Sequence, residues 1–377
     1  SLVDLRKMWS APNPGTLPGS PLLVSPETVA AISGLWGQPA EGAVAVISNE
    51  ALLDEAWKRR TSWAIVPFED LEPRWKVLRV DGRSPIDKPF DVANYALKVA
   101  FVIQGQVQAE AALSTLVPAE MSFLTNEDPQ GITTVVTTGV TALTRATAYA
   151  MEKKGLTYPG RDIRDWLALA DITHISNEVS FYADCPYPNP ASDLLYFCSR
   201  PSYLSLLEYV GADVVELSGN HNNDTKAYYG ADVYGSTLEL YAGQGMQTFA
   251  GGMNVEDARK PAILERNGMR FAFLGCNAAG PPAAWATESS PGAAPCEDNQ
   301  WLIDAIRQER EQGNLPIVTF QYFENYIDSA LEPEKALYRQ VADAGALVVD
   351  GSQAHTPKGM EFYHGAFIHY GLGNLFF

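Results

Sequence analysis

The sequence lacks any run of about 18 apolar residues, which is the length that a helix needs to cross a bilayer. Basic residues are also few, because Lys and Arg number 27 against 45 Asp and Glu, and the formal net charge is −18. Nucleic acids and anionic membrane surfaces both attract proteins through Lys and Arg. The composition therefore predicts no transmembrane segment in this chain, and it argues against nucleic acid or an anionic membrane surface as a partner.

Cysteine is scarce as well, with four residues that fall into two sequential pairs. Cys185 and Cys198 flank one Pro-rich loop, and Cys276 and Cys296 flank another. An even number of cysteines in local pairs predicts two disulfides and an extracytoplasmic protein, either secreted or at the cell surface, since the cytosol keeps thiols reduced. Four reduced thiols that lie near one another are the alternative. Neither spacing is CxxC-like, which argues against a zinc knuckle.

What the sequence does contain is apolar residues, at 46% of a chain of 377, which is enough for the cores of two domains. The turn-rich segment EDPQG at 127–131 predicts the boundary between them. An N-terminal α/β lobe is therefore predicted at 1–128 and a larger domain at 129–377. Within the lobe, strands are predicted at 42–48, 62–68 and 93–103, with a helix at 49–60 that Asn49 caps.

Strand-like and helix-like segments alternate through the larger domain. This alternation predicts an α/β fold with a largely parallel sheet that helices cover on both faces. One predicted helix, at 160–170, places Trp166 and Leu167 together on its apolar face. In such sheets, functional residues gather in loops at the carboxyl ends of strands. Polar clusters follow the predicted strands at 176–178, 219–224, 321–325 and 351–355.

Several of these segments resemble motifs of the CapA family, which is named for poly-γ-glutamate capsule biosynthesis and has a metallophosphoesterase-like fold. GNHNND at 219–224 resembles the family's NNHxxD, GALVVDGSQAH at 345–355 resembles GADxVVGxHxH, and YGLGN at 370–374 resembles YSLGN. The resemblance covers roughly 133–377, and it implies a layered domain with largely parallel sheets covered by helices. The N-terminal lobe, through WAIVPFEDL and WKVLRVDG, resembles one lobe of a periplasmic solute-binding protein.

The sequence departs from the family pattern at positions where the family holds a pair of metal ions. Val140 stands where the family has Asp, and Gln321 and Gln353 stand where it has His. Valine donates nothing, and a glutamine amide is a poor replacement for imidazole toward zinc, manganese or iron. The two-metal phosphoesterase mechanism is therefore disfavoured. No cofactor is expected beyond, at most, one weakly bound divalent metal held by Glu178, Asn220, His221 and His355.

The candidate catalytic residues are Glu178, His221 and His355. A carboxylate that follows an apolar strand, as Glu178 does, could act as a general acid or base with its pKa raised by desolvation. A salt bridge to Arg145 is the alternative for Glu178, and capping of the next helix is the alternative for His221. The candidate substrate-binding residues are Arg145, which could anchor a carboxylate or phosphate, together with Asn220, Gln321 and Gln353.

Two hypotheses for function follow. In the first, an extracytoplasmic CapA-like protein acts on or binds a cell-surface polymer or a peptide-like anion of the poly-γ-glutamate or capsule type. If it is an enzyme, it is of hydrolase type and uses metal-independent or single-metal acid/base chemistry. In the alternative, a non-catalytic surface or assembly protein kept the CapA fold and lost the binuclear metal site. An open pocket would favour the first hypothesis, and a pocket filled by its own side chains would favour the second.

Overall fold

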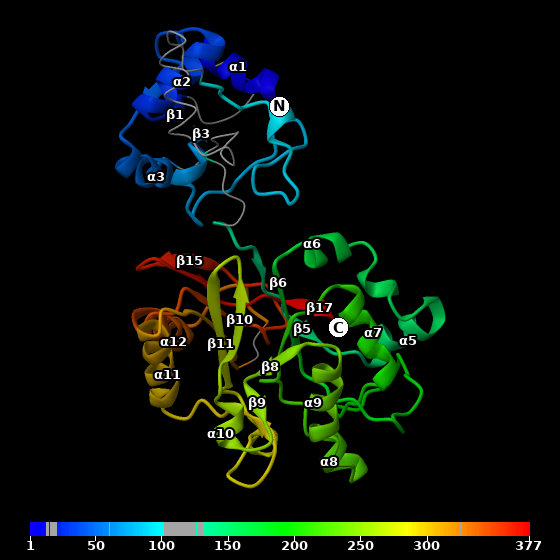
Figure 1. The fold of residues 1–377 in the computed structure, drawn as a ribbon. Helices are drawn as coiled ribbons and strands as arrows, with labels where there is room; N and C mark the ends of the chain where they lie inside the picture. The colour runs from blue at the N-terminus through cyan, green and yellow to red at the C-terminus, as the bar shows by residue number, and fades with distance from the viewer. Residues whose placement is uncertain (13–14, 16–20, 60, 102–125, 127–130, 324–325) are drawn as a thin grey trace, which may run out of the picture. The chain divides into compact units, whose positions relative to one another are not determined.

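The computed structural model describes residues 1–12, 15, 21–59, 61–101, 126, 131–323 and 326–377. The chain divides into two compact units, Ser1–Ile132 and Thr133–Phe377, both of which are drawn in Figure 1. Each unit has hydrophobic clusters of its own, and each is described by itself. The division lies close to the boundary that the turn-rich segment at 127–131 predicts.

The N-terminal unit contains a three-stranded parallel sheet in the order β2-β1-β3. Its elements are α1 (Leu2–Ser10), β1 (Leu22–Val24), α2 (Pro26–Trp36), β2 (Val44–Val46), α3 (Asn49–Lys58), β3 (Ala64–Ile65), η1 (Phe68–Asp70) and η2 (Val92–Asn94). Trp9 of α1 and Ile32 of α2 pack on Leu22 and Val24 of the central strand. Burial of a large apolar side chain contributes about 1.5–3 kcal/mol, so this contact holds two helices on one sheet.

Two predictions for this unit are wrong. The N-cap of α3 is Ser48, one residue before Asn49, and Asn49 is already helical. The predicted strand at 93–103 is absent from its described part, residues 93–101, where η2 and turns stand instead; residues 102–103 lie outside the described residues. Apolar residues in this segment do not alternate strictly, and strict alternation is the pattern that distinguishes a half-buried strand.

The C-terminal unit is built on two six-stranded sheets. The first has the order β17-β5-β6-β7-β8, with β4 also paired to β6, and all of these pairings are parallel. Its strands are β4 (Val135–Val136), β5 (Val140–Thr141), β6 (Ile172–Asn177), β7 (Val214–Glu216), β8 (Gln247–Phe249) and β17 (Asn374–Phe376). Together, β4 and β5 run beside β6 as one interrupted strand.

The second sheet has the order β10-β11-β13-β14-β16-β15, and it is parallel except for the antiparallel pair at each edge. Its strands are β10 (Ala262–Arg266), β11 (Met269–Asn277), β13 (Leu315–Gln321), β14 (Val348–Asp350), β15 (Met360–Tyr363) and β16 (Ala366–His369). A separate two-stranded ladder joins β9 (Gly251–Gly252) to β12 (Gly292–Ala293).

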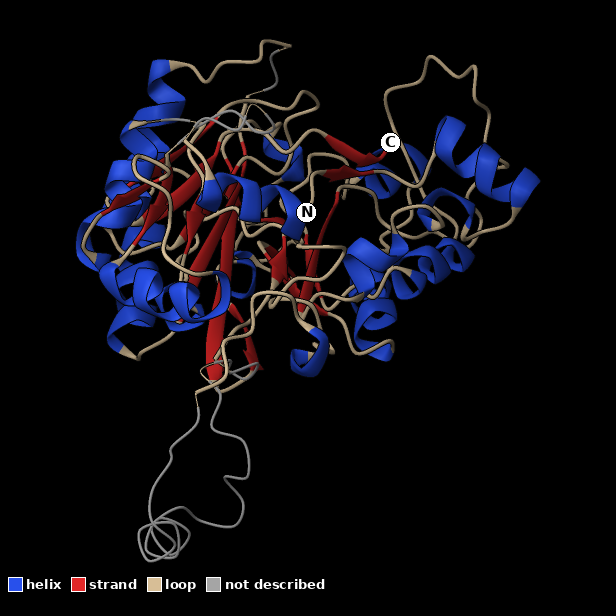
Figure 2. Cartoon of the chain, turned by 90° about the horizontal axis from the view of Figure 1, so that it is seen from above, coloured by secondary structure: helices blue, strands red, loops and turns tan. Residues whose placement is uncertain are grey.

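The two sheets pack face to face, and helices cover their outer faces (Figures 1 and 2). Ile172 and Val214 of the first sheet meet Phe273 and Ile317 of the second in one buried cluster. The helices of this unit are α5 (Arg145–Lys154), α6 (Arg164–Ala168), α7 (Leu204–Tyr209), α8 (Asp224–Tyr229), α9 (Tyr234–Gly243), α10 (Val255–Ala258), α11 (Gln300–Glu311) and α12 (Glu332–Asp343), with the short η4 (Tyr158–Gly160), η5 (Pro201–Tyr203) and η6 (Pro282–Ala284).

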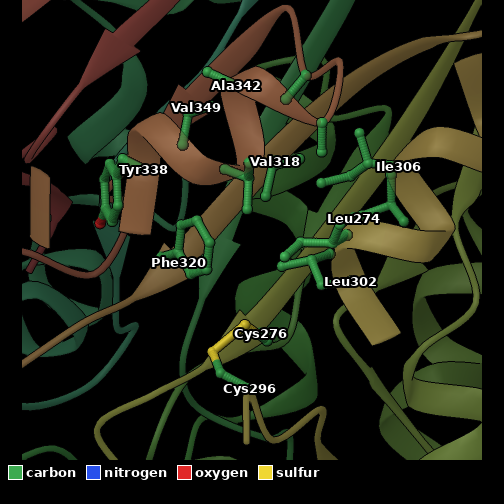
Figure 3. Close-up of a cluster of buried hydrophobic side chains, with 14 of the residues drawn as sticks. Leu274, Cys276, Cys296, Leu302, Ile306, Val318, Phe320, Tyr338, Ala342 and Val349 are labelled. Atoms are coloured by element: carbon green, nitrogen blue, oxygen red, sulfur yellow. A yellow bond between two sulfur atoms is a disulfide. The ribbon is translucent and has the colours of Figure 1, made fainter. Parts of the chain in front are cut away.

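Each sheet therefore carries helices on one face only. Residues of α5, α7 and α9 pack on the first sheet, and residues of α11 and α12 pack on the second. Figure 3 shows the second of these clusters, in which Leu302 and Ile306 of α11 lie against Leu274 and Val318. The predicted layered α/β fold with largely parallel sheets, of metallophosphoesterase-like type, is confirmed. The prediction of helices on both faces of one sheet is wrong, because the other sheet takes the inner face.

Both predicted disulfides are confirmed, since the structure joins Cys185 to Cys198 and Cys276 to Cys296. In the chain-entropy description, closing loops of 13 and 20 residues stabilises the fold by about 3 kcal/mol each. None of the helices in the described part of the chain combines the length and apolar character that crossing a membrane requires.

Candidate functional site

Polar residues of both sheets gather where parallel strands end. In the first sheet, Glu178 follows β6 directly, and the loop 217–223 follows β7. In the second sheet, Gln321 is the last residue of β13, and Gln353 lies just beyond β14. The sheets face each other, so these ends meet between them.

Gly219 brings the loop after β7 against the end of β6. A Cβ at Gly219 would lie 2.3 Å from Glu178 Cβ and 2.4 Å from Glu178 Cα, which is far closer than two carbon atoms can approach. Only glycine permits this approach. The structure thus places Glu178 and the loop that carries Asn220 and His221 side by side at the same end of the sheet.

A cluster of buried amides and hydroxyls, here called the amide cluster, joins the two sheets. Gln353 Nε2 donates to Ser176 Oγ over 2.7 Å, from the second sheet to the first. Asn277 Nδ2 donates to Gln321 Oε1 over 2.7 Å and to the backbone oxygen of Ser218 over 2.8 Å. All five residues are at most 2% exposed. These hydrogen bonds link the two sheets, although the buried Gln353 Oε1 has no hydrogen-bond partner among the described residues.

The amide cluster does not fit a pair of divalent metals. Val140 is fully buried and pairs in register with Ser176, so an apolar side chain occupies the position that the family fills with a carboxylate. The Gln353 amide donates its N–H to Ser176, and its Oε1, which has no hydrogen-bond partner among the described residues, is a neutral oxygen that replaces imidazole poorly as a ligand of zinc, manganese or iron. Among the described residues, no group of three or more His, Cys, Asp or Glu side chains is placed to hold a metal ion.

His221 and Asp224 form a dyad at the rim of the amide cluster. His221 Nδ1 lies 2.7 Å from Asp224 Oδ2, and the two side chains are 19% and 12% exposed. The backbone N–H of Phe197 also donates to Asp224 Oδ2, over 2.8 Å, and the Phe197 ring lies 4.4 Å from the His221 ring between centroids. A carboxylate that accepts a hydrogen bond from Nδ1–H orients the imidazole and assigns proton exchange to Nε2.

Arg145 lies beside this dyad, over the same Phe197 ring. Its guanidinium carbon is 4.9 Å from the ring centroid, and its Nη2 donates to the backbone oxygen of Leu194 over 2.9 Å. Its Nε has no hydrogen-bond partner among the described residues. Arg145 also has a φ of +45°, which is a strained value for a residue with a side chain. The Phe197 ring therefore contacts both the Arg145 guanidinium and the His221 imidazole.

The other predicted site residues lie at the edges of this region. His355 Nδ1 is 2.8 Å from Asn374 Oδ1, and its ring lies 4.5 Å from the ring of Phe377. Asn374 pairs in register with Val140 on β5, so His355 lies at the β17 side of the site. Asn220 is half-buried on the loop after β7, and its Oδ1 has no hydrogen-bond partner among the described residues.

A second buried polar group lies deeper between the sheets. His174 Nε2 is 3.2 Å from Glu216 Oε2, and the hydroxyls of Ser218 and Ser352 donate to Glu216 Oε1. Burial raises the pKa of Glu216, but its hydrogen bonds with His174 and the two serines outweigh that effect and leave the pKa below its ordinary value. Asp350 differs, because burial raises its pKa to about 7. At neutral pH this carboxyl therefore holds a proton part of the time.

Two residues of the candidate site, Asp224 and Asn277, are not among the candidates named from the sequence. Asp224 stands three positions after His221, a spacing that brings two side chains to one face of a helical turn. Asn277 ends β11 and matches no family motif quoted above. Its position at the end of a buried strand was the available signal.

A family model described as "Bacterial capsule synthesis protein PGA_cap" matches residues 134–377. The PGA biosynthesis protein CapA of Bacillus subtilis (strain 168) is 26% identical over 175 residues, which are 46% of this chain and 45% of that protein. The capsule biosynthesis protein CapA of Bacillus anthracis is 25% identical over 186 residues, 48% of this chain and 44% of that protein. A probable polyglutamine synthesis accessory protein of Mycobacterium tuberculosis (strain CDC 1551 / Oshkosh) is 26% identical over 224 residues, 54% and 55% of the two chains. The chain spans about half the length of these curated relatives.

Proposed function

Because this chain belongs to the bacterial capsule synthesis protein family PGA_cap, we propose that it is an extracytoplasmic accessory protein that acts on an anionic cell-surface polymer of the poly-γ-glutamate type. Two disulfides support the location, since disulfides persist in oxidising compartments. The names of the relatives, which refer to PGA, capsule and polyglutamine synthesis, support the polymer class.

The chemistry that we propose is metal-independent hydrolysis of an amide bond. The hydrogen bond of 2.7 Å between His221 and Asp224, beside the Arg145 guanidinium, is the observation that carries it. Arg145 binds a carboxylate of the polymer and thereby positions the amide. His221 Nε2 takes a proton from a water molecule as its oxygen attacks the carbonyl carbon. It then gives that proton to the nitrogen of the leaving amine, while Asp224 stabilises the imidazolium in between.

Glu178 and His355 have subordinate roles in this proposal. Glu178 is 1% exposed and lies against Gly219, so it supports the loop of the dyad and supplies a second carboxyl close to it. His355, which is bound to Asn374, lines the opposite edge of the site. Gln321 and Gln353 belong to the amide cluster and hold the sheets together instead of contacting the polymer.

Incubation of the protein with oligo-γ-glutamate, followed by mass spectrometry of the products, tests this proposal. We expect cleavage that persists in EDTA and falls by about 10²–10⁴-fold in His221→Asn, which is the usual contribution of a general acid or base. Asp224→Asn should reduce cleavage less. His364→Asn is the matched control, because His364 also pairs with an aspartate, Asp343, at 2.8 Å but lies exposed on the β15–β16 turn. Cleavage that EDTA abolishes would contradict the proposal.

The second candidate function is non-catalytic, and one observation favours it. The amide cluster fills the position between the sheets with the protein's own side chains, as expected of a member that kept the fold and lost the site. Such a protein would bind the polymer or an assembly partner without turnover. Retained oligo-γ-glutamate binding that needs Arg145, with no cleavage product in either EDTA or metal, would identify this function.

A further inference from the structure

Four tyrosines form a continuous aromatic surface next to the dyad, here called the tyrosine platform. Tyr196 stacks on Tyr228 with 4.3 Å between ring centroids and an interplanar angle of 16°. The Tyr229 ring lies edge-on to the Tyr196 ring, with 5.8 Å between centroids. It is tilted against the Tyr182 ring, with 5.7 Å between centroids. Tyr196 is followed directly by Phe197, which contacts His221. The platform therefore extends from the rim of the candidate site along α8.

The platform is open to solvent, although its rings are held in place. Tyr228 is 60% exposed and Tyr229 is 36% exposed. Tyr196 belongs to the loop that the Cys185–Cys198 disulfide closes. Tyr182 lies three residues before that loop, and its N–H donates to the backbone oxygen of Ser199 over 2.8 Å. Rigid rings lose little conformational entropy when a ligand binds. The rings of Tyr228 and Tyr229, which stand on α8 and contact the rings of Tyr196 and Tyr182, are therefore pre-organised for contact with a ligand.

A hollow continues the platform on the side of Tyr182. Its volume is about 430 Å³, and its lining includes Phe181, Tyr182, Pro201, Val233 and Glu239. Small-molecule sites have volumes of about 300–1,000 Å³ and combine apolar walls with a few polar groups. The Glu239 carboxylate is exposed and supplies an acceptor at the wall of this hollow.

The charges around the platform disfavour an anionic ligand. Asp224, whose charge acts on Tyr229, and Glu239 bring negative charge to it, and Lys226 on α8 is paired with Asp232 at 2.8 Å. Burial, and then the neighbouring Tyr196 and Asp224, raise the pKa of Tyr229, so its hydroxyl keeps a proton to donate. An anionic polymer would be repelled here. A pyranose ring has C–H groups on its faces for aromatic rings and hydroxyls on its edge for phenols and carboxylates.

We propose that the tyrosine platform and its hollow bind a neutral saccharide chain, with pyranose rings stacked on Tyr228 and Tyr229 and hydroxyls bonded to Glu239. This binding site is separate from the anion site at Arg145, and it does not depend on catalysis by the dyad. It would hold the protein on a glycan while the dyad faces the anionic polymer.

Isothermal titration calorimetry of the full chain with chitohexaose and with cellohexaose tests the proposal. These β-1,4-linked chains are flat and present apolar faces along their length. We expect saturable binding to at least one of them, weakened about tenfold by Tyr228→Ala, since loss of one aromatic contact costs about 1.4 kcal/mol or tenfold in affinity. Tyr228→Phe keeps the ring and should keep most of the affinity.

Tyr326→Ala is the matched control, because Tyr326 is 78% exposed and lies outside the platform. His221→Asn should bind the saccharide as the unsubstituted protein does, whether or not the dyad is catalytic, so failure of the proposed hydrolysis and failure of this proposal are distinguishable. Three results would overturn it: no saturable binding of either saccharide, equal losses in Tyr228→Ala and Tyr326→Ala, or binding of oligo-γ-glutamate that Tyr228→Ala abolishes.

Discussion

At the scale of a single residue, the close contact between Gly219 and Glu178 leads to a testable prediction. Gly219→Ala adds a carbon atom 2.3 Å from Glu178 Cβ, so the loop of the dyad has to move. We expect a loss of about 1–3 kcal/mol in the free energy of unfolding, the usual cost of an extra methyl in a packed site. Urea denaturation measures the loss, and oligo-γ-glutamate cleavage, if present, should fall with it.

Gly243→Ala is the control for this substitution. Gly243 ends α9, and a Cβ added there would meet no atom within 4 Å. Alanine is favoured over glycine in helices by roughly 0.5–1 kcal/mol, so this variant should be as stable as the unsubstituted protein or slightly more stable. Equal effects of the two substitutions would show that the contact between Gly219 and Glu178 is loose.

A sequence motif points to individual candidate residues, but it does not show which residues from elsewhere in the chain will contact them. GNHNND identified His221, because an Asn-His pair after a buried strand is a recognisable pattern. The contact of the His221 ring with Phe197 joins residues 24 positions apart and follows from a disulfide-closed loop. Such contacts depend on how loops fold back, and neither periodicity nor spacing describes that.

At the scale of the element, the buried carboxyl of Asp350, the last residue of β14, leads to a prediction about stability and pH. Burial raises the pKa of Asp350 from 3.8 to about 7, whereas the unfolded chain leaves it near its ordinary value. The folded state then binds more protons than the unfolded state between about pH 4 and 7, so the Asp350 contribution to stability falls as the pH rises through that window. At 1.36 kcal/mol per pKa unit, the fall is at most about 4 kcal/mol.

Asp350→Asn tests this assignment, because an amide resembles the protonated carboxyl and does not titrate. Relative to the unsubstituted protein, the variant should gain stability as the pH rises from 5 to 8, measured by urea denaturation at each pH. The lowered pKa of Glu216 acts in the opposite direction, but only as the pH falls below about 4.5, where Glu216 loses its stabilising charge. Asp165→Asn is the control, because the Asp165 side chain is 83% exposed and pairs with an arginine, which does not titrate in this range. A constant difference between pH 5 and 8 would contradict the assignment.

At the scale of elements, sequence patterns predicted long buried strands and amphipathic helices correctly. The strands β6, β11 and β13 and the helices α11 and α12 follow the predicted alternation of strands and helices in the larger domain. The short helix α6 shows the limit, since Trp166 was placed on its apolar face and is 77% exposed, while Leu167 is buried. A helix of five residues makes little more than one turn, so its apolar residues do not define a face.

At the scale of the whole molecule, the alternation of strands and helices indicates parallel strands but does not show where the chain passes from one sheet to another. The candidate site forms where the chain has passed from the first sheet to the second. The hydrogen bonds of Gln353 to Ser176 and of Ser352 to Glu216 both cross between these sheets. Local patterns carry no information on such long-range pairings. The family resemblance supplied the layered fold that periodicity could not.

The amide cluster between the sheets also makes a prediction about metal binding, which substitution of metal ligands into it tests. In the triple variant Val140→Asp/Gln321→His/Gln353→His, a carboxylate and two imidazoles replace a buried apolar group and two amides. Without metal these groups are buried and poorly paired, so the variant should unfold at a lower temperature than the unsubstituted protein. Added Mn²⁺ or Zn²⁺ should reverse much of that loss, because a metal that binds only the folded state stabilises it.

Mass spectrometry of bound metal should find less than one equivalent per chain in the unsubstituted protein and more in the variant. Gln244→His/Gln312→His, at exposed positions, controls for added histidines. About two equivalents in the unsubstituted protein would show that the amide cluster is a metal site after all.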